Sequence, residues 1–281
     1  YETLLRDYGP SVAVAVPVPV AVPVGFMTPA EKHVGVRNAI RTTSGEGWEM
    51  WNRQAVMSFD WTCRWAKFKA TNGVTAPMCV HPPPDVVSTA VSQQGRWHEC
   101  DRLTKLWKDA GDAVNEKSVY LEIGGNIGSC VMQILLTTKA PIIVFEPDPR
   151  NQFVLTNTLM GLSQELRDRV SLFPIALGSE KGGSTINAAL GNMGNAVVGS
   201  QIKDGPAQQF REPIPIRIER LDSILNTNNP GWNVPLLKID AQGFECRIMD
   251  AMGSVGDRIR AVGTEIAQYW LVGIGCTDTG Y

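Results

Sequence analysis

The sequence has no concentration of positive charge. Its 26 Lys and Arg residues are outnumbered by 28 Asp and Glu residues, which leaves a net charge of −2 at pH 7, and no dense basic run occurs anywhere. Proteins that bind a nucleic-acid backbone need such basic patches to neutralise phosphates. We therefore expect no nucleic-acid partner.

Signals for metal binding and for secretion are also scarce. The chain has three histidines and six cysteines, with no Cys-x-x-Cys pair and no His/Cys cluster, so we expect no metal site. It has no Asn-x-Ser/Thr glycosylation motif, which favours a cytoplasmic location over the secretory lumen. We expect six reduced, mostly buried thiols. Disulfides are the alternative, and Cys79 with Cys100 is then the first pair expected.

The chain also lacks an uninterrupted run of apolar residues that could form a membrane helix. The 23 residues between Asp7 and Glu31 are uncharged and long enough to span a bilayer, but several prolines would break the helical hydrogen bonds. No basic segment precedes them, as a signal peptide would require. Residues 1–30 are therefore predicted to form an extended Val/Pro-rich arm, which could dock in a homo-oligomer or a larger complex.

Residues 31–103 form an N-terminal accessory region that is rich in tryptophan. The spacing of Trp48 with Trp51, and of Trp61 with Trp65, places each pair on one face of a helix. Packing against the main domain is the plain interpretation. A platform on which sugar rings stack is the alternative.

From Ser118 onward, the hydrophobic pattern alternates between strand and helix, so residues 104–281 are predicted to form an α/β domain with a doubly wound, mostly parallel, Rossmann-like sheet. A glycine-rich stretch between Gly178 and Ile218 predicts a hairpin and a mobile loop beside the ligand pocket. The predicted strands are 118–123, 141–145, 170–175, 234–239 and 259–265, and the predicted helices are 101–110, 127–137, 150–161 and 244–252.

A glycine loop follows the first predicted strand, in the segment Val119-Tyr-Leu-Glu-Ile-Gly-Gly-Asn-Ile-Gly128. Such a loop brings backbone N–H groups and a helix N-terminus close to a ligand. The next strand ends in Glu146, which could bind the two hydroxyls of an adenosine ribose. An NAD loop would need glycine where Asn126 stands, whereas the spacing from Glu122 to Gly128 fits enzymes that use S-adenosylmethionine (SAM).

Further motifs make the chain resemble the FkbM-type methyltransferase family. They are Val144-Phe-Glu-Pro-Asp-Pro-Arg-Asn151, Pro174-Ile-Ala-Leu-Gly178, Ile218-Glu-Arg-Leu-Asp222 and Leu236-Leu-Lys-Ile-Asp-Ala-Gln-Gly-Phe-Glu245. The family usually has Asp-x-Glu-Gly-x-Glu in the last motif, and this chain keeps Asp240, Gly243 and Glu245 but has Gln242. The resemblance implies a class I SAM-dependent O-methyltransferase that acts on a hydroxyl of a sugar, glycolipid or polyketide. The aromatic N-terminal region favours a carbohydrate or glycoconjugate acceptor.

Candidate site residues follow from these motifs. Asp240 is expected to be the base that accepts the proton of the acceptor hydroxyl. The further catalytic candidates are Glu245, Glu265 and His98, and His81 is another possible base. A purely structural role, such as capping the following helix, is the alternative for Asp240 and Glu245. SAM is expected to contact Glu122, Gly124, Gly125, Asn126, Gly128, Glu146, Pro147, Ala176, Leu177 and Asp240.

The alternative function is a catalytically silent scaffold or assembly subunit. Gln242 and the Val/Pro arm favour that interpretation.

Overall fold

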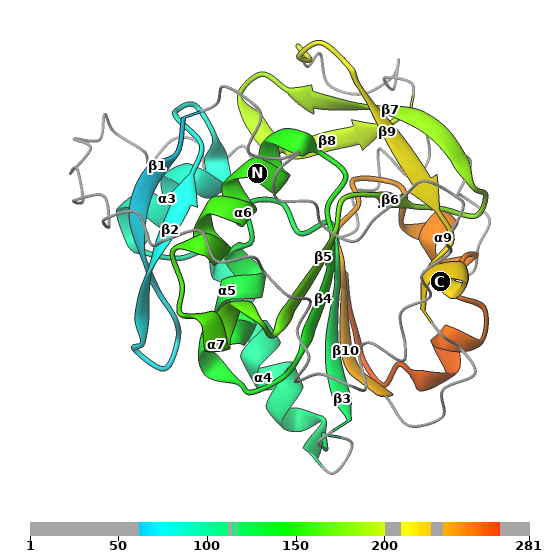
Figure 1. Cartoon of the computed structure of the whole chain (residues 1–281), viewed down its shortest axis with the longest axis horizontal. Coiled ribbons are helices and arrows are strands. Elements are labelled where there is room, and N and C mark those ends of the chain that lie inside the picture. Colours follow the sequence, from blue (N-terminus) through cyan, green and yellow to red (C-terminus); the bar gives the residue numbers. More distant parts are fainter. Residues whose placement is uncertain (1–61, 112–113, 116, 200–208, 226–232, 265–281) are drawn as a thin grey trace.

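The computed structural model describes residues 62–111, 114–115, 117–199, 209–225 and 233–264. Helices pack on both sides of a parallel sheet (Figure 1), so the predicted α/β class is confirmed. The Val/Pro arm, Trp48, Trp51, Trp61 and Glu265 lie outside the described residues.

In the described part of the chain, the central sheet has five parallel strands in the order β11-β10-β3-β4-β5. The chain runs outward from β3 in one direction and then returns to the other side of β3, as in a doubly wound sheet. All the carboxyl ends therefore meet at one edge. The strands are β3 (Ser118–Ile123), β4 (Ile142–Phe145), β5 (Val170–Phe173), β10 (Asn233–Ile239) and β11 (Val262–Thr264).

Each face of this sheet is covered by a separate hydrophobic core, because side chains alternate along a strand. Tyr120 and Val144 face the core beneath α4, α5 and α6. Leu121 and Phe145 face the core beneath α8, α9 and the 3-10 helix η4. The helices are α4 (Asp101–Asp109), α5 (Ser129–Thr137), α6 (Pro149–Met160), α7 (Gln164–Arg167), α8 (Leu221–Ile224), α9 (Glu245–Met249) and η4 (Gly253–Arg258).

A second sheet lies beyond the carboxyl ends of the central strands, in the upper right of Figure 1. Its order is β6-β9-β7-β8, and β7 pairs with β8 as an antiparallel hairpin. The predicted hairpin in the glycine-rich stretch is thus confirmed. The strands are β6 (Ala176–Leu177), β7 (Gly182–Ala189), β8 (Asn192–Val198) and β9 (Ile214–Glu219).

Upstream of α4, the chain forms a β-hairpin and a helix that were not predicted: β1 (Arg64–Lys69), β2 (Thr75–Val80) and α3 (Val86–Gln94), followed by the 3-10 helix η2 (His98–Cys100). The predicted helical pairing of Trp61 with Trp65 is wrong, because Trp65 lies on β1 and packs against the core of the first sheet face. The predicted boundary between residues 103 and 104 falls inside α4, so the structure offers no break there.

The expectation of reduced cysteines is wrong for the described residues. Cys63 is bonded to Cys79, and Cys100 is bonded to Cys130. Cys246 is disulfide-bonded as well. The pairing of Cys79 with Cys100 is also wrong, because Cys79 on β2 faces the start of β1 whereas η2 packs against α5.

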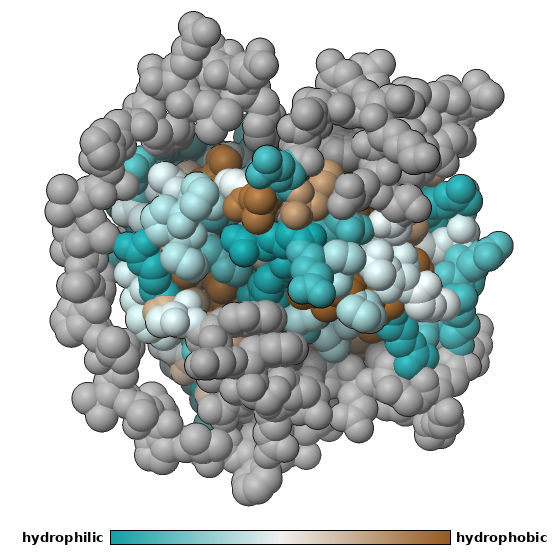
Figure 2. Space-filling model, turned by 90° about the horizontal axis from the view of Figure 1, so that it is seen from above, coloured by the Kyte–Doolittle hydropathy of each residue, from teal (hydrophilic) through white to brown (hydrophobic). Residues whose placement is uncertain are grey.

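The visible surface of the described residues is mixed in character. Hydrophilic residues gather across the middle of the face in Figure 2, and the hydrophobic areas beside them are small and separate. Val74, Leu190 and Val262 are the exposed large hydrophobic residues in the described part. No helix in that part is both long and apolar enough to cross a bilayer.

Candidate functional site

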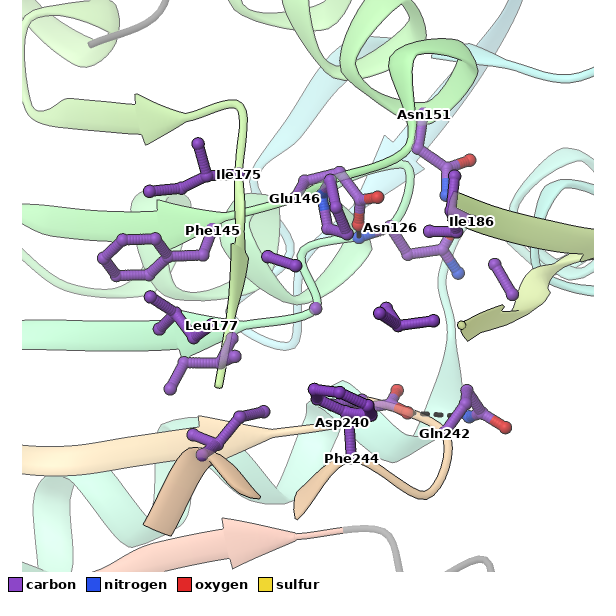
Figure 3. Close-up of a pocket in the computed structure, with 18 of the residues that line it drawn as sticks. Asn126, Phe145, Glu146, Asn151, Ile175, Leu177, Ile186, Asp240, Gln242 and Phe244 are labelled. Carbon is purple, nitrogen blue, oxygen red and sulfur yellow. Dashed lines mark hydrogen bonds between the residues drawn. The ribbon is translucent and has the colours of Figure 1, made fainter. Parts of the chain in front are cut away.

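A pocket lies at the carboxyl edge of the central sheet (Figure 3), where ligands bind in doubly wound folds. Its floor comes from the ends of β3, β4 and β10, and the β7–β8 hairpin forms a wall. The lining residues are Ile123, Gly124, Asn126, Phe145, Glu146, Pro147, Asn151, Ile175, Ala176, Leu177, Ile186, Gly194, Ala196, Val198, Asp240, Ala241, Gln242, Phe244 and Ile248.

One side of the pocket is apolar. Phe145, Ile175 and Leu177 lie together on this side in Figure 3, and Phe244 lies below them, beside Asp240. Phe145 is held in place because its ring stacks on Phe173, with 5.0 Å between the ring centroids. Such a wall suits a flat, weakly polar ring such as a nucleobase.

Glu146 stands at the opposite, polar side with only 4% of its surface exposed. Its carboxylate accepts hydrogen bonds from the backbone N–H groups of Asn126, at 2.6 Å, and Asp148, at 2.8 Å. Burial, followed by the nearby carboxylate of Asp148, raises the pKa of Glu146 to about 8. Each carboxylate oxygen has a second lone pair, so two further donors can still be accepted.

The glycine loop does not present free N–H groups to the pocket, contrary to expectation. Gly124 and Gly125 both donate to the Phe145 carbonyl, and Gly128 donates to the Gly125 carbonyl. The N–H of Asn126 is bound by Glu146, and that of Ile127 is bound by the Asn126 side chain. The loop therefore faces the pocket through the Asn126 side chain and the backbone surface of Gly124.

The three loop glycines are needed for packing within the protein. A Cβ on Gly124 would lie 1.8 Å from the Asp240 carbonyl oxygen, and one on Gly125 would lie 2.4 Å from Val144. Gly128 has a φ of +90° and faces Leu155 of α6. Gly125 and Gly128 are not among the residues that line the pocket, and their contact with SAM stays a prediction.

Glu122 was also expected at the cofactor, but it is buried beneath the pocket. It lies on the same sheet face as Tyr120, whose hydroxyl donates to it at 2.9 Å, and Lys238 on β10 lies beside it at 3.8 Å. Its neighbour Ile123 points to the other face and lines the pocket. Burial raises the pKa of Glu122 to about 7, although Lys238 and Tyr120 oppose that shift.

Asp240 reaches the pocket from the end of β10. One carboxylate oxygen accepts from Lys238 at 3.2 Å, and the other accepts from the Gln242 amide at 2.8 Å, drawn as a dashed line in Figure 3. Although burial opposes its charge, the pKa of Lys238 is raised above its usual value, because the carboxylates of Asp240 and Glu122 together favour the ammonium. Asp240 does not cap α9.

Glu245 organises the loop between β10 and α9. One of its oxygens accepts from the backbone N–H groups of Ala241, at 3.1 Å, and Gly243, at 3.2 Å. Its side chain is buried and does not line the pocket. Burial raises the pKa of Glu245. These contacts support the structural alternative for Glu245 over a direct catalytic role.

A comparison with protein-family models matches residues 122–270 to the methyltransferase FkbM domain, which is more than half of the 281 residues. The chain belongs to the FkbM methyltransferase family. Comparisons with curated proteins and with solved structures found no match. The FkbM match contains every pocket residue described above, but not β1, β2, α3 or α4.

The other expected site residues divide into two groups. Pro147, Ala176 and Leu177 line the pocket of this FkbM protein, as do Gly124, Asn126, Glu146 and Asp240, and their binding roles stay predictions. His98 does not reach the pocket. It lies on η2, with 59% of its side chain exposed, and hydrogen-bonds to Gln94. Cys100, two residues later on the same short helix, is buried and bonded to Cys130 of α5.

Sequence reasoning missed several lining residues. Phe145 and Asn151 belong to the recognised motif around Glu146. The alternation of side chains along a strand could have indicated Phe145, and the start of a helix could have indicated Asn151. Phe244 and Gln242 were in the β10 motif but were not assigned to the pocket. No sequence pattern indicated that Gly194 and the other hairpin residues would line the pocket, since their position depends on how the second sheet folds over the first.

Proposed function

We propose that this FkbM protein transfers a methyl group from SAM to a hydroxyl oxygen, and that the acceptor is a carbohydrate or glycoconjugate. The observation that carries the proposal is the placement of two acids, Glu146 and Asp240, at the ends of β4 and β10 in one pocket. One acid can hold a ribose while the other faces the space for an acceptor.

The pocket residues fit SAM by their chemistry. Glu146 can accept hydrogen bonds from two ribose hydroxyls, and charge-assisted bonds of this kind contribute about 1.5–3 kcal/mol. The apolar side at Phe145, Leu177 and Phe244 suits adenine. Asn126 and Gly124 border the space between Glu146 and Asp240, where the methionine part would lie.

SAM supplies an electrophilic methyl group on a sulfonium, which leaves as a neutral thioether. The protein therefore has no leaving group to protonate, and its main task is to hold the acceptor oxygen in line with the methyl carbon. As the new C–O bond forms and the S–C bond breaks, the hydroxyl proton must go to a base. Asp240 can accept it, because its carboxylate faces the pocket and has lone pairs beyond those used by Lys238 and Gln242.

The second candidate is a catalytically silent scaffold, and Gln242 is the observation that favours it. The family's glutamate at this position would add a second negative charge beside Asp240. The glutamine donates a hydrogen bond to Asp240 instead, so Asp240 keeps its place in the pocket. This local compensation favours the enzyme over the scaffold.

Calorimetry with SAM and S-adenosylhomocysteine, followed by transfer of radiolabelled methyl into glycan, lipid and protein fractions, tests the proposal. We expect micromolar binding and label in the glycan or glycolipid fraction. Binding without transfer to any fraction would favour the scaffold. Binding of NAD or NADP in place of SAM would contradict the choice of cofactor, which rests partly on Asn126.

A further inference from the structure

A short segment upstream of the FkbM match contacts the pocket. His81 follows β2, and Asp85 is the N-cap of α3, so both precede the first matched residue, Glu122. The segment is held firmly in place. The N–H of His81 donates to Ser88 Oγ at 3.0 Å, and Asp85 Oδ2 accepts from Ser88 N at 2.9 Å.

Asp85 also ties this segment to the wall of the pocket. It is 2% exposed, and its second oxygen accepts from the N–H of Met193 at 2.8 Å, at the start of β8. The next residue, Gly194, lies so close to Asn126 that an added Cβ would be 2.6 Å from the Asn126 amide nitrogen. The segment therefore has a fixed position relative to the pocket.

His81 reaches the polar side of the pocket through Asn151. Its Nε2 lies 2.8 Å from Asn151 Oδ1, and the Asn151 side chain lies close enough to the Glu146 carboxylate to favour its ionised form. Asn151 is 3% exposed and lines the pocket near Glu146 and Asn126 in Figure 3.

The orientation of the Asn151 amide follows from its contact with His81. The Asn151 oxygen faces His81, so Nε2 of His81 must carry a proton and donate. The NH₂ group of Asn151 is then the part of the amide that is turned toward Glu146, where its partial positive charge favours the carboxylate. The resulting series of contacts runs from His81 to Asn151 to Glu146.

We propose that His81 is a positioning residue of the cofactor site, which acts through Asn151 to hold the Glu146 carboxylate in the orientation that binds two ribose hydroxyls. Without the His81 donor, the Asn151 amide can rotate and turn its oxygen toward Glu146, which repels the carboxylate and displaces it. The inference rests on the proposed use of SAM, and it places a determinant of cofactor affinity outside the FkbM match.

The test uses two ligands that differ only at the ribose: 5′-methylthioadenosine and its 2′,3′-dideoxy counterpart. For His81→Leu, we expect calorimetry to show a loss of about tenfold in affinity for 5′-methylthioadenosine and less than twofold for the dideoxy ligand. His81→Gln should stay within threefold of the unaltered protein for both ligands, because the glutamine amide can place a donor near the position of Nε2. Asn151→Ala should show the same ribose-dependent loss as His81→Leu, and it provides a second variant if His81→Leu does not fold.

His98→Leu is the matched control, because His98 is an exposed histidine without contact to the pocket. It should leave both affinities unchanged. Equal losses for the two ligands in His81→Leu and Asn151→Ala would show general disruption of the pocket and would overturn the inference, as would no loss in either variant. Failure of the unaltered protein to bind S-adenosylhomocysteine or 5′-methylthioadenosine would instead overturn the proposed function, and this inference with it.

Discussion

The two acids in the pocket are held by different kinds of neighbour. Glu146 is bound by backbone N–H groups with the Asn151 amide beside it, and the nearby charge that acts on it is the carboxylate of Asp148. Asp240 is bound by the ammonium of Lys238 and the Gln242 amide. Dipoles orient a carboxylate without supplying an opposite charge, whereas a lysine places a compensating positive charge beside it. The two acids therefore differ in their surroundings: Glu146 has fixed dipoles that suit it to binding hydroxyls, and Asp240 has a cation beside it.

The largest effect is expected from Asp240→Asn. The methyl-transfer rate should fall about 10²-fold or more, because an amide cannot take the acceptor's proton. SAM affinity should change little, because Gln242 can reverse its amide to match the new side chain. Single-turnover kinetics and calorimetry on this variant measure both quantities. Nearly intact turnover with a loss of thermal stability would instead show a structural role for Asp240.

Glu146→Ala should act on binding. It should weaken SAM and S-adenosylhomocysteine by roughly 10-fold to 100-fold without unfolding the chain, since the bonds it removes contribute about 1.5–3 kcal/mol. Calorimetry gives the affinities, and a thermal melt verifies the fold. Equal affinity in the variant and the unaltered protein would remove the ribose role.

The difference between the two acids also predicts a pH dependence. The pKa of Glu146 is about 8, above its usual value of 4.5, so the carboxylate ionises mainly between pH 7 and 9. Affinity for 5′-methylthioadenosine, which has no amino acid group, should rise about tenfold over that range. Stability should move in the opposite direction, because the folded state retains a proton that the unfolded state has lost. It should fall as the pH rises from about 4.5 toward 8, and Glu146→Gln should flatten both curves.

The smallest effect on binding is expected from Glu122→Gln. Affinity for S-adenosylhomocysteine should stay within threefold, because Glu122 lies on the sheet face away from the pocket. The free energy of unfolding should change by less than about 1 kcal/mol, because the weaker bond to Tyr120 is offset by the removal of a buried charge that the fold disfavours. A loss of binding comparable to that of Glu146→Ala would show that Glu122 does reach the ligand.

Local patterns in the sequence predicted the central sheet well. β3 begins and ends at the predicted residues, and Glu146 and Asp240 lie in one pocket because parallel strands bring their carboxyl ends together. The orientation of Glu122 was missed. Every residue of β3 is buried, so no alternation of polar and apolar residues showed which face it takes. The helix predicted over 244–252 is shorter, because the chain passes into η4 at Gly253.

Contacts between distant segments account for the rest. The disulfide between Cys100 and Cys130 depends on how η2 packs against α5, which spacing along the chain does not reveal. The hairpin residues in the pocket, such as Ile186, depend on the second sheet lying over the first. Asn151 gains its role from His81, 70 residues earlier.

The core shared by β1, β2 and α4 with α5 and α6 limits how this family domain can be moved or exchanged. Phe68, Met78 and Leu103 are each 2% exposed or less, and they lie in one cluster with Val131 and Leu155 of the matched region. A fragment cut at residue 122 would open that apolar surface to water. It would also separate Cys130 from its bonding partner. The unit that recombination or protein engineering can transplant is therefore larger than the stretch by which the family is recognised.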